Sequence, residues 1–393
     1  MRNRFTWSEW SGAVGDLGTT LPIAFALVEA SGFAPTRLFF LWGLVYVATG
    51  AFYRIPMSVQ PLKAMAVIAI TSGVGASLLS TTAVFYGVLL LVLVATGLIQ
   101  TIDDWFSAGL VRGVQFGIGL LLAEKALGLV VDHSVYLGQS FGSTTSVVIG
   151  TALVIVVVGI GVRRRLPVAL LCAMGGVLAA VVLGVEPGVA TEAPLVDLAL
   201  PDWTQFGTAL TMLMIPQLPL TLGNAVYAAS DACRRFWPER ADRATAPWLA
   251  TSIGGSNVLI GLLGGFPICH GAGGIAAHER LGGRTGGTTM ILGAAFVALA
   301  LIPGGGQLLF LIPVPILGAL LLWDSWAMVE VLGSCDDLPQ GLVATTVGLL
   351  GWTTHHLTIA VAVGAVAEWL LARPPVRYRL LQLQRRAARR LPV

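Results

Sequence analysis

The amino-acid sequence predicts an all-α protein that crosses a membrane many times. Of its 393 residues, 56% are hydrophobic and only 11% are charged, whereas an average soluble domain is about 25% charged. The mean hydropathy is +0.83. A chain with so few charges cannot cover its exterior with groups that water solvates, so we expect lipid to surround much of it.

The apolar residues gather into fourteen segments. A helix needs about 20 residues to cross the roughly 30 Å hydrocarbon core of a bilayer, and most of the segments are long enough. The third and the tenth are too short to cross as continuous helices. The predicted spans are 12–30, 36–54, 59–72, 83–101, 105–123, 144–161, 166–184, 204–229, 247–264, 271–279, 286–303, 307–323, 340–354 and 355–371.

The basic residues predict the orientation, because cytoplasmic loops collect Lys and Arg. With fourteen crossings, 18 of the 23 basic residues fall on one side. We therefore expect an integral inner-membrane protein with both termini in the cytoplasm. The loop 185–203 falls on the other side and contains no Lys or Arg. One acidic loop is also expected in the cytoplasm, and it contains Asp324, Glu330, Asp336 and Asp337.

Several other classes of protein are disfavoured. The N-terminus lacks the pattern of a removable signal peptide. Zinc-finger, RNA-recognition and basic-zipper patterns are absent, so no nucleic-acid partner is expected. The four cysteines stand far apart without a CxxC pair, which indicates neither a metal site nor a disulfide framework. HExxH, GxSxG and Walker A sequences are also missing, so we expect no enzyme, no ATP-driven pump and no cofactor.

The chain divides near residue 195 into two halves of seven spans each. Residues 1–195 and 196–372 would then form two repeats of opposite membrane orientation, an arrangement found in many secondary transporters, followed by a basic cytoplasmic tail, 373–393. Local sequence supports this division. GDLGTTLP and IPMSVQPLKA in the first half correspond to PQLPLTLGN and FPICHGAGG in the second. In each half, a first span rich in Gly, Pro and Thr precedes a short third span.

Proline and glycine predict breaks before both short spans. Pro56 and Pro61 disfavour helix in the residues before them, so 57–60 should be extended and a helix should begin near Pro61. Pro267 and the following glycines predict the same for 267–270. Unwound backbone at membrane depth is tolerated where it lines a cavity. Two half-helices would therefore point their positive N-terminal ends at one site, which favours an anion.

These segments carry a family resemblance. GDLGTTLP, IPMSVQPLKAMA, PQLPLTLGNAV and GGFPICHGAGG resemble signature segments of the molybdate transporter family, which is related to the SulP sulfate permeases, and the likeness runs from about residue 12 to residue 372. Because only about 20 residues follow the last predicted span, we expect no C-terminal STAS domain like that of the SulP permeases. It also lacks the acidic residues that uracil and xanthine permeases present from spans eight and ten, which disfavours a nucleobase permease.

The resemblance implies a core domain built from spans 1–4 and 8–11 and a gate domain built from spans 5–7 and 12–14. It further implies an oxyanion bound between the third and tenth spans, elevator-like movement and a homodimer. Molybdate is the first expected substrate, with sulfate or tungstate as the alternative. The two kinds of anion share charge and shape, so the sequence does not separate them, nor does it separate proton symport from uniport or exchange.

Two charged residues are the main candidates for function. Lys63 lies in the first turn of the third span, where an ammonium at membrane depth needs a partner. It either attracts the anion or forms a structural pair with Asp16, and the two roles are compatible. Asp16 lies in the irregular first span, where it pairs with Lys63, caps backbone amides or accepts a coupling proton. His270, which precedes the tenth span, is the second candidate for the coupling proton.

The remaining candidates for binding the substrate are uncharged. Amide side chains donate hydrogen bonds to an oxyanion, although interhelical hydrogen bonds are the alternative role. Glycines let backbone N–H groups approach a ligand closely. The full predicted substrate-binding set is Thr19, Gln60, Lys63, Gln217, Asn224, His270, Gly271, Gly273 and Gly274.

A few other polar residues are expected to be structural. His278, His355 and His356 are interpreted as interface or loop residues. Glu124 and Lys125 are interpreted as a structural pair. The glycines of the ninth span are expected to permit close helix packing; they are Gly254, Gly255, Gly261, Gly264 and Gly265.

Overall fold

A computed structural model describes residues 2–99, 106–131, 168–186 and 193–371, with a few single residues between and after these ranges. Almost all of the predicted sixth span, 144–161, and of the basic tail, 373–393, lies outside the described residues. The described part is helical apart from two strands of two residues each. The predicted all-α class is therefore confirmed for this part of the chain.

Among the described residues, the first half contains four helical segments long and apolar enough to cross a membrane, and the first broken span. Pro35 opens α3 at a first-turn position, and Gly32 and Gly73 end α2 and α4 in the left-handed conformation that glycine adopts without strain. The elements are α1 (Trp7–Ala13), η1 (Val14–Asp16), α2 (Leu17–Ser31), α3 (Pro35–Tyr53), β1 (Gln60–Pro61), α4 (Lys63–Ser72), α5 (Ala76–Ala95), α7 (Ala108–Val131) and α9 (Val168–Val182).

The second half begins with a long helix in which two π-helical stretches, η3 and η4, interrupt the α-helix. The elements up to the second broken span are η2 (Trp203–Gln205), α10 (Phe206–Thr208), η3 (Ala209–Met214), α11 (Ile215–Leu220), η4 (Thr221–Ala228), α12 (Ala229–Phe236), η5 (Ala241–Arg243), α13 (Ala246–Leu262), β2 (Ile268–Cys269) and α14 (Ala272–Arg280). The remaining elements are α15 (Gly287–Leu301), η6 (Gly305–Leu311), α16 (Val314–Glu330), η7 (Val331–Ser334), α17 (Leu338–Thr354) and α18 (Leu357–Leu371).

Two predicted spans were placed wrongly. The fourth begins at Ala76 rather than at residue 83. Its first turns are rich in Ser and Thr, which lowers the local hydropathy, but the Ser80 and Thr82 hydroxyls donate to carbonyls four residues earlier and so fit within the helix. The twelfth, predicted at 307–323, is interrupted after Leu311, and α16 then runs from Val314 to Glu330. Asp324 is therefore in a helix, not in a loop.

Six helices in the described ranges are long and apolar enough to cross a membrane. A seventh is obtained if α15 and η6, which bend by 103° at a short break, count as one span. Three further apolar helices are shorter, and one of them is α4. The structure therefore shows a membrane protein with several apolar spans, whereas the predicted count of fourteen remains a prediction.

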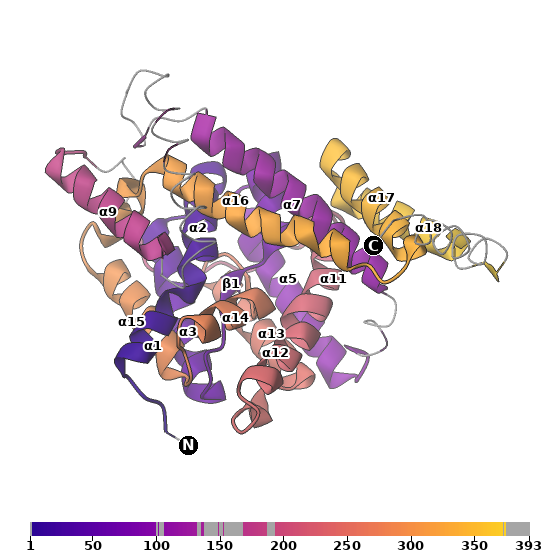
Figure 1. The fold of residues 1–393 in the computed structure, drawn as a ribbon, viewed down its shortest axis with the longest axis horizontal. Helices are drawn as coiled ribbons and strands as arrows, with labels where there is room; N and C mark the ends of the chain where they lie inside the picture. The colour runs from indigo at the N-terminus through magenta and orange to yellow at the C-terminus, as the bar shows by residue number, and fades with distance from the viewer. Residues whose placement is uncertain are drawn as a thin grey trace, which may run out of the picture.

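The two short strands pair with each other at the centre of the molecule (Figure 1). β1 and β2 are antiparallel, with Gln60 opposite Cys269 and Pro61 opposite Ile268. The Leu62 N–H also donates to the Pro267 carbonyl at 3.1 Å. This confirms the prediction that the extended segments near 57–60 and 267–270 face each other. Each strand leads directly into a short helix, α4 with ten residues and α14 with nine.

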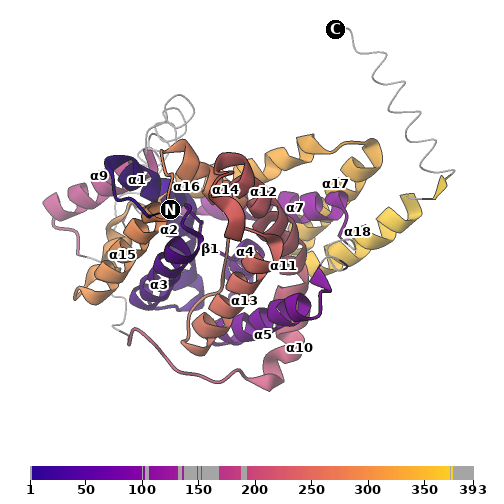
Figure 2. The same ribbon diagram turned by 90° about the horizontal axis from the view of Figure 1, so that it is seen from below.

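The helices pack in two groups. In one group α3 packs on α15 and α5 packs on α13, while α2 packs on β1 and α13 packs on β2. In the other, α7 packs on both α16 and α17, and α17 packs on α18. Figure 1 shows α7 and α16 side by side along one edge of the molecule, and Figure 2 shows α17 and α18 beyond them.

Glycine pairs allow the closest helix contacts. A Cβ added at Gly43 would meet the backbone of Gly293, and one added at Gly87 would meet the backbone of Gly254. Gly261 also abuts the backbone of α5, so two of the predicted packing glycines of the ninth span have that role. Gly255 faces open space instead.

Candidate functional site

A polar pocket lies where the two half-helices meet the second group of helices. Its volume is about 170 Å³, the space of five or six waters at about 30 Å³ each, which is enough for a tetrahedral oxyanion of five atoms. Residues of β1, α4, α7, the long helix of the second half, β2, α14, α16 and η7 form its wall. The lining residues are Gln60, Lys63, Gln115, Gln217, Leu220, Asn224, Cys269, Gly273, Asp324, Ala327, Met328 and Val331.

The strands in front of the pocket are held by buried side chains. Asn257 of α13 accepts from the Ile268 N–H at 2.7 Å and donates to the Ile268 carbonyl at 2.9 Å. The Trp42 ring N–H donates to the Phe266 carbonyl at 3.0 Å. These bonds satisfy extended backbone that lies away from water, where each unpaired group is expensive. They therefore fix the point at which α14 begins.

Gln217 connects the long helix of the second half to the N-terminus of α4. Its Oε1 accepts from the backbone N–H groups of Ala64 and Met65 at 3.0 and 3.3 Å, which are first-turn donors without intrahelical acceptors. Its Nε2 donates to the Thr221 hydroxyl at 3.1 Å, and that hydroxyl in turn accepts from Tyr86. Gln217 thus acts as a side-chain cap that spans the two halves of the chain.

Lys63 forms an ion pair with Asp324 rather than with Asp16. The Lys63 Nζ lies 2.8 Å from the Asp324 Oδ1, and the Thr19 hydroxyl donates to the same oxygen at 3.1 Å. The predicted pair between Lys63 and Asp16 is therefore wrong. The pair joins α4 to α16, one helix from each group, and both side chains line the pocket.

Asp16 is instead the centre of a buried hydrogen-bond cluster behind the pocket. Its Oδ1 accepts from the Gln60 Nε2 at 2.8 Å and from the Ser58 hydroxyl at 3.0 Å. Its Oδ2 accepts from the Tyr46 hydroxyl at 2.8 Å and from the Val59 N–H. Asp16 therefore anchors the extended segment before α4 and orients Gln60.

His278 completes this cluster and is a second correction. Its Nε2 lies 2.9 Å from the Asp16 Oδ2, its Nδ1 lies 2.8 Å from the Gly12 carbonyl, and the side chain is fully buried. The interpretation of His278 as an interface or loop residue is wrong, because the histidine packs α14 onto the first helix of the chain. The predicted pair between Glu124 and Lys125 is also wrong, since Lys125 pairs with Glu29 at 3.6 Å.

The remaining predicted site residues divide between the pocket and its surroundings. Gly273 lines the pocket, and a Cβ there would meet nothing within 4 Å. Gly271 and Gly274 face inward, where a Cβ would collide with Gln60 and, at Gly274, also with Asp16. His270 is buried away from the pocket, with one ring nitrogen 2.7 Å from the Ser252 hydroxyl and the other 2.8 Å from the Ser58 carbonyl.

Of the nine predicted binding residues, Gln60, Lys63, Gln217, Asn224 and Gly273 line one pocket, and Thr19 touches it through Asp324. Sequence reasoning missed Asp324, Gln115 and Cys269. A signal for Asp324 was present, since a carboxylate inside an apolar stretch that begins at Pro313 marks a functional position. Within the described residues, no group of three His, Cys, Asp or Glu side chains is placed to hold a metal ion.

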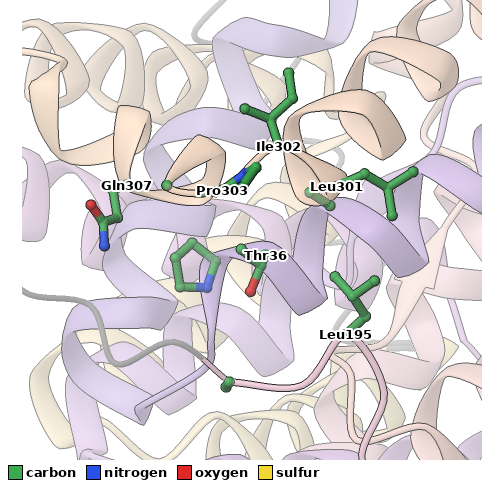
Figure 3. Close-up of a pocket in the computed structure, with 11 residues that line it drawn as sticks. Thr36, Leu195, Leu301, Ile302, Pro303 and Gln307 are labelled. Carbon is green, nitrogen blue, oxygen red and sulfur yellow. The ribbon is translucent and has the colours of Figure 1, made fainter.

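A second, larger cavity of about 250 Å³ lies at the bend between α15 and η6 (Figure 3). Thr36, Leu195 and Gln307 contribute to its wall, and none of its lining residues is charged. An anion leaving water needs compensating charge or dipoles. The smaller pocket at Lys63, not this one, is therefore the candidate site for an anion.

Comparison with known sequences identifies relatives that cover most of this chain. The family model described as "Molybdate transporter of MFS superfamily" matches residues 8–122 and 209–328. Molybdate transporter 1 of Arabidopsis thaliana is 30% identical over 93% of this chain and 87% of its own length. Molybdate transporter 1 of Chlamydomonas reinhardtii is 28% identical, with 93% and 92% covered.

Two solved structures share the fold. The transmembrane domain of the cyanobacterial bicarbonate transporter BicA superposes with a TM-score of 0.65 at 18% identity, covering 94% of this chain and 98% of that one. Murine Slc26a9, an anion transporter in the inward-facing state, also gives 0.65 at 13% identity, covering 94% and 69%. The fold is thus that of the SulP and SLC26 transporters, and this chain, a transporter and not an enzyme, belongs to the molybdate transporter family.

Proposed function

We propose that this protein is a secondary transporter that moves molybdate across the cytoplasmic membrane, with tungstate or sulfate as alternative substrates. The observation that carries the proposal is the position of Lys63, a cation in the first turn of α4 that lines the same pocket as Gly273 in the first turn of α14. Two helix N-termini and one ammonium favour an anion at this point. Molybdate transporters that are 30% and 28% identical to this chain support molybdate as the transported anion.

The anion would be bound by one charge and several neutral donors. Lys63 supplies the charge, and the amides of Gln115 and Asn224 lie on the pocket wall. Gly273 brings backbone to the wall without a side chain in front of it. Neutral donors orient a tetrahedral oxyanion without holding it so strongly that release becomes slow. This balance suits a transporter better than a storage protein.

We further propose that the chain is an inverted repeat whose two groups of helices move against each other. Reciprocal packing supports the repeat, because the second span of each half packs on the fourth span of the other half. These contacts are α3 on α15 and α13 on α5. One paired strand lies at the start of the predicted third span and the other just before the predicted tenth. The first group of helices corresponds to the core domain and α7, α16, α17 and α18 to the gate domain of an elevator mechanism.

The identity of the coupling ion is also a proposal. Concentrating a dianion against an inside-negative potential costs about 4.6 kcal/mol per 100 mV, so uptake needs a co-transported cation, and a proton is the simplest. Asp16 and His270 are the candidates from sequence. Both lie outside the pocket and make several hydrogen bonds of their own, which favours structural roles for them.

The test is uptake by purified protein in liposomes. Molybdate uptake that tungstate and sulfate inhibit, and that uracil does not, would support the proposal. An imposed inward proton gradient should then drive accumulation. Uptake of uracil instead of oxyanions would refute it in favour of a nucleobase permease. Cytoplasmic termini and a homodimer remain predictions that cysteine labelling in cells and mass measurement in nanodiscs would check.

A further inference from the structure

We propose that Asp324 belongs to the substrate site. Its carboxylate pairs with the Lys63 ammonium when the site is empty, the anion takes its place on binding, and Asp324 then binds a proton. The inference rests on the proposed function, because it assigns a residue and a linked ion to the same pocket. It departs from the sequence analysis, which placed Asp324 in a loop and the coupling proton on Asp16 or His270.

The two carboxylate oxygens of Asp324 differ in their hydrogen-bond partners. Oδ1 accepts from the Lys63 ammonium at 2.8 Å and from the Thr19 hydroxyl at 3.1 Å. Oδ2 is buried and has no hydrogen-bond partner in the described part of the chain. A carboxylate oxygen on Lys63 occupies the position that an oxyanion oxygen would take. The Asp324 carboxylate therefore competes with the substrate anion for the Lys63 ammonium.

Charge balance then links the anion to a proton. If a dianion binds at Lys63 while Asp324 stays ionised, three negative charges face one positive charge, and the side chains of Lys63 and Asp324 are only 18% and 13% exposed. Like charges at such distances disfavour the ionised carboxylate. A proton on the unpartnered Oδ2 removes one negative charge and supplies a donor for that oxygen. Anion and proton consequently promote each other's binding, and this coupling is reciprocal.

The charged groups of α7, which packs on α16, are engaged elsewhere, and Glu124 accepts from the Trp352 ring N–H. On α7, Arg112 contacts Asp336 and Gln340, and Lys125 pairs with Glu29. The buried Asp16 and His278 lie on the far side of Gln60 and do not line the pocket. Among the described lining residues, Lys63 and Asp324 alone carry formal charge at neutral pH. The exchange therefore involves this pair.

The chain offers a matched control. Its two lysines are Lys63 and Lys125, and each pairs with a carboxylate on a helix of the other group. The second pair, between Lys125 and Glu29, lies outside the pocket. Glu29→Gln therefore makes the same kind of change as Asp324→Asn, the loss of a lysine's acidic partner, without touching the proposed exchange.

The experiment measures molybdate binding to the full chain in nanodiscs by calorimetry between about pH 5.5 and pH 8. For the wild type and Glu29→Gln, affinity should rise as the pH falls, approaching about tenfold per pH unit, with close to one proton taken up per anion in weak buffer. Asp324→Asn should bind tightly at every pH and take up no proton. A sulfate series, in which the ligand stays a dianion, separates this effect from protonation of molybdate.

Each outcome decides a different question. Binding by the wild type without pH dependence, or an Asp324→Asn variant with the wild-type slope, would overturn the inference and leave the proposed function standing. A wild type that binds none of the oxyanions would overturn both. If Asp324→Asn does not fold, the proton count of the wild type decides alone: uptake near one per anion supports the exchange, and no uptake refutes it.

Discussion

Replacing Lys63 by methionine is the most direct test of the anion site. At an effective dielectric constant of about 20, a dianion centred about 4 Å from the Lys63 Nζ gains about 8 kcal/mol. The anion must first displace Asp324, whose pair at 2.8 Å is worth about 6 kcal/mol on the same scale. The difference, about 2 kcal/mol, corresponds to roughly thirty-fold in affinity. Lys63→Met should therefore weaken molybdate binding by ten-fold or more.

The assay is equilibrium binding of molybdate to purified protein, with the melting temperature of each variant as the check on folding. Lys125→Met is the control, because it removes the other lysine, which pairs with Glu29 outside the pocket. This control should bind molybdate like the wild type. A folded Lys63→Met protein with unchanged affinity would refute the reasoning, and would show that the lysine serves only to join α4 to α16.

Three further changes separate binding from folding. Gly273→Ala should leave the melting temperature unchanged, because the new methyl group enters open space in the pocket. It should weaken the binding of molybdate more than that of the smaller sulfate. Equal loss of affinity for both anions in competition binding would contradict this. Gly274→Ala should destabilise the protein, because the new Cβ collides with Asp16, and denaturation that matches the wild type would contradict the cluster. Gln217→Leu removes the cap of α4 and should lower the free energy of unfolding by about 1–2 kcal/mol, measured by thermal or denaturant unfolding. Stability equal to that of the wild type would show that water replaces the cap.

The local backbone of the site was predictable from sequence, because proline and glycine act on the residues beside them. Pro56 and Pro61 in the first half, and Pro267 with the glycines that follow it in the second, predict two extended segments followed by short helices. The strands β1 and β2 confirm them. That both segments open a short apolar span also predicted that they would meet. Five of the nine predicted binding residues then line one pocket. Gln60, Lys63 and Gly273 sit beside these breaks. Gln217 and Asn224 reach the pocket from the long helix of the second half.

The partners of the charged side chains were not predictable in the same way. Lys63 and Asp324 are 261 positions apart, and Asp16 and His278 are 262 apart. Periodicity and propensity describe neighbours along the chain and carry no information on such contacts. The misplaced twelfth span then put Asp324 outside the membrane, although Pro313 before the new helix and Pro315 in its first turn fit a helix start at Val314.

The two π-helical stretches of the long helix have a consequence for how this protein can vary among relatives. A π-turn contains an extra residue compared with an α-turn, and such insertions often persist at functional sites. Gln217 and Asn224 stand on either side of the start of η4 and face one pocket. Deleting a single residue between them would rotate one against the other by about 100°. Relatives that use both amides must therefore keep the spacing of this segment free of insertions and deletions, even where its apolar side chains are exchanged.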